Sequence, residues 1–364
     1  MWHLLFLQDY RCRVSLMKNE TGGIDAREFD NGKWATSTNI GRSSLFGLMR
    51  KCNGEYKAMM NCDSHIDKSL KIGKKKAISR ANGFSVGLLL DDYMSPAYFC
   101  AHSWSGFDFD CIDDEERRNE LGNSMYDLQA FACFKVHETL KNMIGAVLKR
   151  NVVGMRSAFV KNDVERDGGF IDMDDVFDGF SEEKIKIIFK KANSVDKDPI
   201  EQLAKDSEDI YEHLASVTGE DFMVKTSGDP ETKKETPLEK SKPLVVNVQA
   251  SLNPVFAKNG GKGSDNSKLA YSIPKNKEEG PFYVCLGDLT RDFEEVRHAG
   301  GVYCWQDKEL NRDLRCTSVP EFNTVPEEEI SYAQWYSDCP DKVKSKVMKA
   351  LDNLKAQGRS FDEL

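Results

Sequence analysis

The 364-residue chain lacks any Cys-x-x-Cys pair, although it contains ten cysteines. Zinc ribbons and thioredoxin-type redox sites depend on such close pairs, so neither is expected. Widely spaced cysteines at this density favour structural disulfides in an oxidising compartment. A cytosolic protein with ten reduced cysteines stays open as the alternative at this point.

Long apolar runs are also absent. No stretch reaches the roughly 20 apolar residues that a membrane-spanning helix needs, so no membrane association is expected. The apolar run near the N-terminal end covers only about six residues, which is too short for the hydrophobic region of a signal peptide. The sequence therefore shows no clear signal peptide. One glycosylation acceptor, Asn19 in Asn-Glu-Thr, agrees weakly with secretion.

The chain lacks an excess of positive charge, because 51 lysines and arginines face 60 aspartates and glutamates. The formal net charge is −9 and the pI is about 5.4, whereas a domain whose whole surface holds DNA is usually basic. Any contact with nucleic acid must therefore be local, or must occur at acidic pH where carboxylates are neutralised. Hydrophobic residues make up 40% of the chain and charged residues 30%, which is typical of a folded globular protein with room for two packed halves.

Runs of apolar residues predict seven strands. They lie at residues 54–62, 84–92, 96–104, 221–227, 244–252, 267–273 and 281–289. A short turn through Pro96 joins the second of these strands to the third, so the two are expected to form a hairpin.

Helical spacing of apolar residues predicts three helices. Residues 127–148 are largely apolar at helical positions. Residues 198–219 read as the clearest helix, with Asp198 as its N-cap and Gly219 at its end. A last helix is expected at residues 342–357.

A basic, glycine-rich loop, KNGGKGS, precedes the strand that carries Lys268. Backbone N–H groups of such a loop can cradle a phosphate, although the signal is weak on its own. A phosphodiesterase site would place a histidine two residues before the lysine, but the residue there is Asn266. An amide donates a hydrogen bond but neither attacks phosphorus nor carries a proton. None of the six histidines of the chain is followed by lysine two positions later.

The segment CLGDLTRDFEEVRHAGGVYC, from Cys285 to Cys304, resembles the C-terminal signature of the deoxyribonuclease II family. The matching residues are Gly287, Asp288, Arg291, Arg297, Gly300 and Gly301. Thr290 stands where the family has asparagine. The resemblance covers roughly residues 25–310, and it implies that Cys285 and Cys304 form a disulfide.

The resemblance implies an α/β fold of the phospholipase D type, with two similar α/β halves whose central mixed sheets face a shared cleft. The halves would cover residues 25–150 and 151–340, with a divergent N-terminus at 1–24 and a C-terminal helix and tail at 341–364. A secreted or lysosomal location, or another luminal one, is implied as well.

The chemistry of the family follows from two His-x-Lys motifs, one from each half. One histidine attacks phosphorus and the other protonates the leaving oxygen. The two lysines neutralise the phosphate oxygens, so neither a metal nor another cofactor is needed. An acidic optimum follows when one imidazole must be protonated first.

This chain departs from the family at both motifs. Phe84 and Val86 stand at the first His-x-Lys, and Asn266 replaces the histidine of the second, where Lys268 is kept. A further family histidine matches His102. We therefore expect a catalytically inactive member of the family that binds DNA weakly and whose protein partner the sequence does not name. The alternatives are an acid endonuclease with a rearranged site using His102 and Lys268, and an unrelated α/β binding protein.

Overall fold

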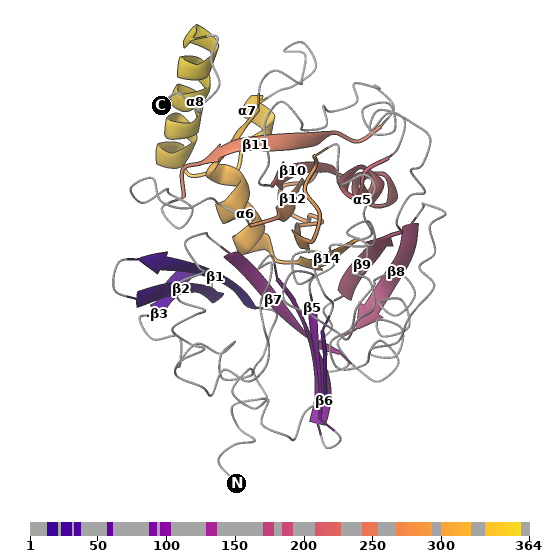
Figure 1. Ribbon diagram of the computed structural model, residues 1–364. Coiled ribbons are helices and arrows are strands. Elements are labelled where there is room, and N and C mark those ends of the chain that lie inside the picture. Colours follow the sequence, from indigo (N-terminus) through magenta and orange to yellow (C-terminus); the bar gives the residue numbers. More distant parts are fainter. Residues whose placement is uncertain are drawn as a thin grey trace, which may run out of the picture.

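The computed structural model (Figure 1) is a mixed α/β protein built on two β-sheets. It describes residues 13–20, 23–30, 33–37, 57–60, 87–92, 95–102, 129–136, 170–177, 184–191, 208–226, 242–253, 267–292, 300–321 and 332–357. No helix within these ranges is long and apolar enough to cross a membrane.

The first sheet has seven strands in the order β3-β2-β1-β7-β6-β5-β4. Their bounds are Arg13–Glu20 (β1), Gly23–Asp30 (β2), Lys33–Ser37 (β3), Lys57–Met60 (β4), Gly87–Asp92 (β5), Ser95–His102 (β6) and Gln129–Val136 (β7). Every neighbouring pair is antiparallel. β1 pairs with β2 and β7 near the middle of the sheet, so the sheet includes part of the segment expected to be a divergent N-terminus.

The second sheet has eight strands in the order β15-β11-β10-β12-β13-β14-β9-β8. Their bounds are Phe170–Phe177 (β8), Lys184–Lys190 (β9), Asp221–Lys225 (β10), Val245–Ser251 (β11), Leu269–Ile273 (β12), Tyr283–Gly287 (β13), Gly300–Gln306 (β14) and Ser318–Pro320 (β15). β10 and β11 run parallel and the other pairs antiparallel. The expectation of a mixed sheet therefore holds for this sheet, whereas the first sheet is antiparallel throughout its described pairs.

Four described helices accompany the second sheet: Ile210–Thr218 (α5), Lys308–Cys316 (α6), Tyr332–Trp335 (α7) and Asp341–Gln357 (α8). Alternation along the strands sends side chains to two buried layers. Phe222 and Val224 pack with α5 in one layer, and Met223 between them belongs to the other.

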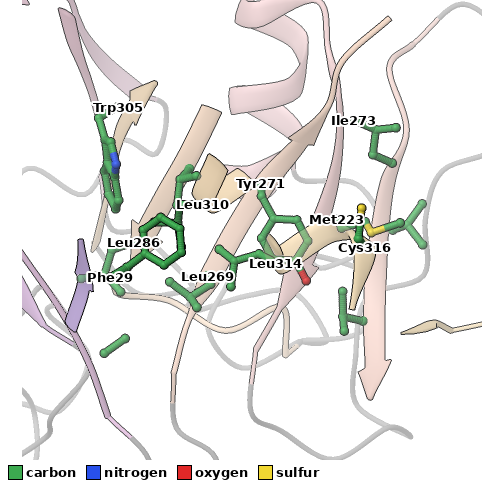
Figure 2. Packing of buried hydrophobic residues seen from close by; sticks show 14 of the residues in the cluster. Phe29, Met223, Leu269, Tyr271, Ile273, Leu286, Trp305, Leu310, Leu314 and Cys316 are labelled. Atoms are coloured by element: carbon green, nitrogen blue, oxygen red, sulfur yellow. The ribbon is translucent and has the colours of Figure 1, made fainter. Parts of the chain in front are cut away.

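The second layer joins the two sheets. It contains Phe29 and Ala101 of the first sheet together with Leu269, Leu286 and side chains of α6 and α8. Figure 2 shows Phe29 near Leu269 and Leu286. Burial of this shared apolar surface holds the sheets against each other, at about 25 cal/mol per Å² removed from water.

The structure confirms the seven predicted strands, the hairpin of β5 and β6, and the last helix. The prediction of a helix over residues 127–148 is wrong for its described part, because Gln129–Val136 forms β7 between β1 and β6. Ala130 and Ala132 are both buried, which is the two-residue period of a strand. β1–β3, β8, β9, β14, β15, α6 and α7 were not predicted.

The N-cap predicted for the helix before Gly219 is also wrong. α5 begins after Asp209, whose carboxylate accepts hydrogen bonds from the N–H groups of Tyr211 and Glu212. The Glu212 carboxylate accepts the N–H of Asp209 in return, which completes a capping box. Asp198 lies outside the described residues. Gly219 ends the helix with φ 71°, as predicted.

Candidate functional site

The candidate phosphate site is the start of β12, which carries Lys268 and lies beside the end of β10, which carries Lys225. Lys225, at the end of β10, pairs in register with Leu269, and its Nζ donates a hydrogen bond of 2.8 Å to Ser267 Oγ. Ser267 is fully buried and Lys268 is half-buried. The carbonyl of Lys268 accepts the N–H of Gly287 at 2.9 Å, which joins this strand to the family-like segment.

The two lysines belong to opposite sides of the strands. Leu269 lies in the layer between the sheets and Ala270 lies in the layer under α5. By this alternation Ser267 and its donor Lys225 belong to the inter-sheet side, and Lys268 belongs to the α5 side. Sequence reasoning singled out Lys268 and missed Lys225, whose only signal was a lysine at the end of a predicted strand.

The other predicted site positions are less completely described. Phe84, Val86 and Asn266 lie outside the described residues, as does the loop of residues 258–264. His102 ends β6 and pairs in register with Phe131.

Two backbone registers place the remaining positions. Gly87, the first residue of β5, pairs with Ala101, the neighbour of His102. The end of β6 therefore lies beside the strand that follows the first degenerate motif. The glycosylation candidate Asn19 pairs with Ile24 near the end of β1.

The family-like segment serves packing, beginning with its cysteines. Cys285 and Cys304 face each other across β13 and β14 with Cα atoms 4.0 Å apart, and they form a disulfide. A side chain at Gly287 would overlap the hydroxyl of Tyr211, which donates a hydrogen bond of 2.6 Å to the carbonyl of Leu289. Glycine is therefore required here for close approach of α5 to the end of β13.

Asp288 holds the start of β14 in place. One of its carboxylate oxygens accepts the N–H of Gly301 at 3.0 Å and the hydroxyl of Tyr303 at 3.1 Å. A Cβ atom on Gly300 would come within 2.5 Å of Leu289, so this position too has room only for glycine. These contacts hold the residues that follow β13 against the start of β14.

Arg291 is fully buried and links three parts of the chain. Its Nε donates to Asp209 at 2.8 Å and its Nη2 donates to Glu212 at 3.2 Å, both at the start of α5. Its Nη1 donates to the side chain of Asn247 in β11 at 2.8 Å and to the carbonyl of Val245 at 3.2 Å. A buried guanidinium needs such partners, because an unpaired buried charge is costly. The arginine of the signature is therefore occupied by structural contacts.

Thr290, which stands where the family has asparagine, makes a hydrogen bond to a residue close to it in sequence. The hydroxyl of Thr290 donates to Asp292 at 2.8 Å. Among the described residues, no group of three or more histidine, cysteine, aspartate or glutamate side chains could hold a metal ion.

A comparison with protein-family models identifies a family. The model for deoxyribonuclease II matches residues 35–324, which is more than half of the chain. No curated protein matches significantly. The matched span contains β12, the disulfide-linked segment and the buried Arg291 network. The chain belongs to the deoxyribonuclease II family.

Proposed function

We propose that this member of the deoxyribonuclease II family does not hydrolyse DNA and keeps the family fold for a binding role. The observation that carries the proposal is the identity of the residues at the two His-x-Lys motifs. Phe84 and Asn266 stand at the two histidine positions, and Val86 stands at the first lysine. The chain contains no His-x-Lys at any position.

The missing groups are those that make and break bonds. Loss of a general acid or base alone typically lowers the rate about 10²–10⁴-fold. Here the nucleophile is missing as well, so only binding and electrostatic effects remain. Val86 also removes a cation that would stabilise the developing negative charge.

The structure supports the proposal through what the retained family residues do. Gly287, Asp288 and Arg291 serve packing and hydrogen bonding within the second sheet. Such residues stay useful without catalysis, because they hold the fold together. A chain that keeps them and lacks the catalytic groups is consistent with a folded, inactive protein.

We propose further that the two sheets belong to the two facing halves of a phospholipase D-like arrangement. The shared buried layer, with Ala101 of β6 and Leu269 of β12, supports it. A secreted or lysosomal location is part of the proposal, supported by family membership and by the disulfides Cys285–Cys304 and Cys316–Cys339.

The alternative function is an acid endonuclease with a rearranged site. It is favoured by one observation, namely that β6 places His102 beside the strand that follows Val86. His102 could supply a proton, and Lys268 could hold a phosphate oxygen. One imidazole cannot both attack phosphorus and protonate the leaving oxygen, so the inactive protein remains our proposal.

Plasmid nicking between about pH 4.5 and 7, with and without metal, tests this. We expect no nicking above a buffer control. Nicking that co-purifies with the protein and disappears in His102→Ala would establish the rearranged site. Nicking that His102→Ala leaves unchanged would indicate a contaminating nuclease.

A gain-of-function variant sharpens the test. Phe84→His, Val86→Lys and Asn266→His together restore both motifs, and we expect this triple variant to nick DNA at acidic pH. The matched control keeps Asn266 and restores only the first motif, and it should stay inactive. A wild-type protein as active as the triple variant would contradict the proposal.

A further inference from the structure

The C-terminal helix α8 lies outside the family match, which ends at residue 324. It is nevertheless firmly attached. Val347 and Leu351 are fully buried in the same apolar cluster as side chains of α6 and β15. The disulfide Cys316–Cys339 joins α6 to the chain two residues before α8 begins. Figure 1 shows α8 at the outer margin of the molecule, away from the first sheet.

The exposed side of α8 carries a row of lysines. Lys342, Lys346 and Lys349 are exposed and follow one another at spacings of four and three residues, so they share one face of the helix. We call these three residues the basic ridge. Within the described part of the chain, none of them has an ion pair or a side-chain hydrogen bond. Five lysines against two aspartates give α8 a charge of +3 in a chain of net charge −9.

We propose that the basic ridge binds the phosphate backbone of nucleic acid. Lys268 is the only cation at the two His-x-Lys motifs, and the ridge supplies positive charge that these motifs lack. DNA is chosen because the family acts on it, so this proposal rests on the proposed function. Lysine side chains contact phosphates as point charges and carry no sequence preference.

The residues around the ridge argue against a membrane or a protein as its partner. An amphipathic helix that binds a bilayer places apolar side chains beside its lysines. Here the neighbours on the exposed side are Ser345, Asp352 and Asn353. Protein interfaces are depleted in lysine and enriched in aromatic residues, and the only large apolar side chain exposed among the described residues is Val217 on α5.

The length of the ridge matches a few phosphates. From Lys342 to Lys349 the helix rises about 10 Å at roughly 1.5 Å per residue. One DNA strand carries a charge about every 3.4 Å of helix axis, so up to three phosphates lie within reach. Three released counterions predict a slope near −2.7 in a plot of log K against log salt. Affinity should then fall about 40-fold between 50 and 200 mM salt.

The test is fluorescence anisotropy with a labelled duplex oligonucleotide at salt concentrations between about 50 and 200 mM. The ridge variant is Lys346→Glu with Lys349→Glu. The charge-matched control is Lys275→Glu with Lys308→Glu, two exposed lysines outside α8. We expect the ridge variant to lose at least tenfold in affinity at 50 mM salt. The salt slope should become shallower, from about −2.7 to between about −1 and zero. The control should keep the wild-type slope.

Three results would contradict the proposal that the basic ridge binds DNA. Equal losses in the ridge variant and the control would indicate an effect of net charge alone. Loss of binding in Lys268→Ala but not in the ridge variant would place the contact at the motif. Binding to anionic phosphatidylserine vesicles without binding to DNA would assign the ridge to membranes. Because cleavage is not measured, failure here leaves the nicking experiments to decide the proposed function separately.

Discussion

Arg315 and Asp338 form a two-point ion pair beside a disulfide. Nη2 of Arg315 donates to both carboxylate oxygens of Asp338, at 2.8 and 2.6 Å. Each residue immediately precedes a cysteine of the disulfide Cys316–Cys339. The side chain of Arg315 is fully buried and that of Asp338 is 20% exposed. Arg315 also donates to the carbonyl of Trp335, so one guanidinium fastens α6 to the chain that leads into α8.

Asp338→Asn should destabilise the protein by about 3 kcal/mol, because it leaves the buried charge of Arg315 without its counterion. Urea denaturation at neutral pH measures the change. The control is Asp352→Asn on the exposed side of α8, which should stay within about 0.5 kcal/mol of the wild type. An equal effect of the two substitutions would show that the ion pair contributes nothing specific.

The same pair predicts how stability depends on pH. Burial raises the pKa of Asp338, but the hydrogen bonds and charge of Arg315 outweigh it and hold the pKa below its ordinary value. A carboxyl with a lowered folded-state pKa contributes stability above its unfolded pKa of about 3.9 and loses it as the pH falls through the folded value. The difference between the wild type and Asp338→Asn should therefore be constant from about pH 7 to 5 and shrink only below about pH 4.

Asp313 should behave in the opposite way. It accepts hydrogen bonds from Trp34 of β3 at 2.8 Å and from Asn253 at 2.7 Å, and so links the two sheets. Burial raises its pKa, although these two donors lower it in part. Its ionised form therefore costs stability at neutral pH, and the cost disappears as the pH falls through the raised pKa.

Asp313→Asn tests this, because the amide stays neutral at every pH. The wild type should gain stability relative to the variant as the pH falls from about 7 toward 4, and the gain should level off below the unfolded pKa. Urea denaturation at each pH gives the difference. A difference that is flat over this range, or that runs the other way, would refute the assignment.

Gly287→Ala should cost about 2–3 kcal/mol, because the added methyl group overlaps the hydroxyl of Tyr211. Tyr211→Phe removes that hydroxyl and its hydrogen bond to Leu289, at a cost of about 1 kcal/mol. The double variant should lose about 1 kcal/mol less stability than the sum of the two single losses. Gly219→Ala is the control, since its cost comes from a φ of 71° with no atom nearby, and Tyr211→Phe should not rescue it.

Arg291→Lys should destabilise by about 3 kcal/mol despite keeping the charge, because an ammonium group cannot reach Asp209, Glu212 and Asn247 together. Thr290→Asn introduces the family residue next to it and should cost about 1 kcal/mol or less, because the amide can still donate a hydrogen bond to Asp292. Thermal unfolding of both variants compares them. Full stability of Arg291→Lys would show that the fork of the guanidinium is not needed.

Much of the fold could be predicted because its signals are local. The apolar runs of β10 to β13, the hairpin of β5 and β6, and the apolar face of α8 all appear in short stretches of sequence. Gly219 ends its helix because glycine takes a positive φ without strain. The absence of His-x-Lys, on which the proposed loss of catalysis rests, is likewise a property of the sequence alone.

Tertiary structure decided the rest, because the partners come from distant parts of the chain. Gln129–Val136 becomes a strand since β1 and β6 offer backbone hydrogen bonds on both sides, and apolar spacing does not record that. Arg291 finds Asp209 across 82 residues and Lys225 finds Ser267 across 42. The sequence shows which side chains carry charge or hydrogen-bonding groups. Only the packing of the sheets and helices determines which residues become their partners.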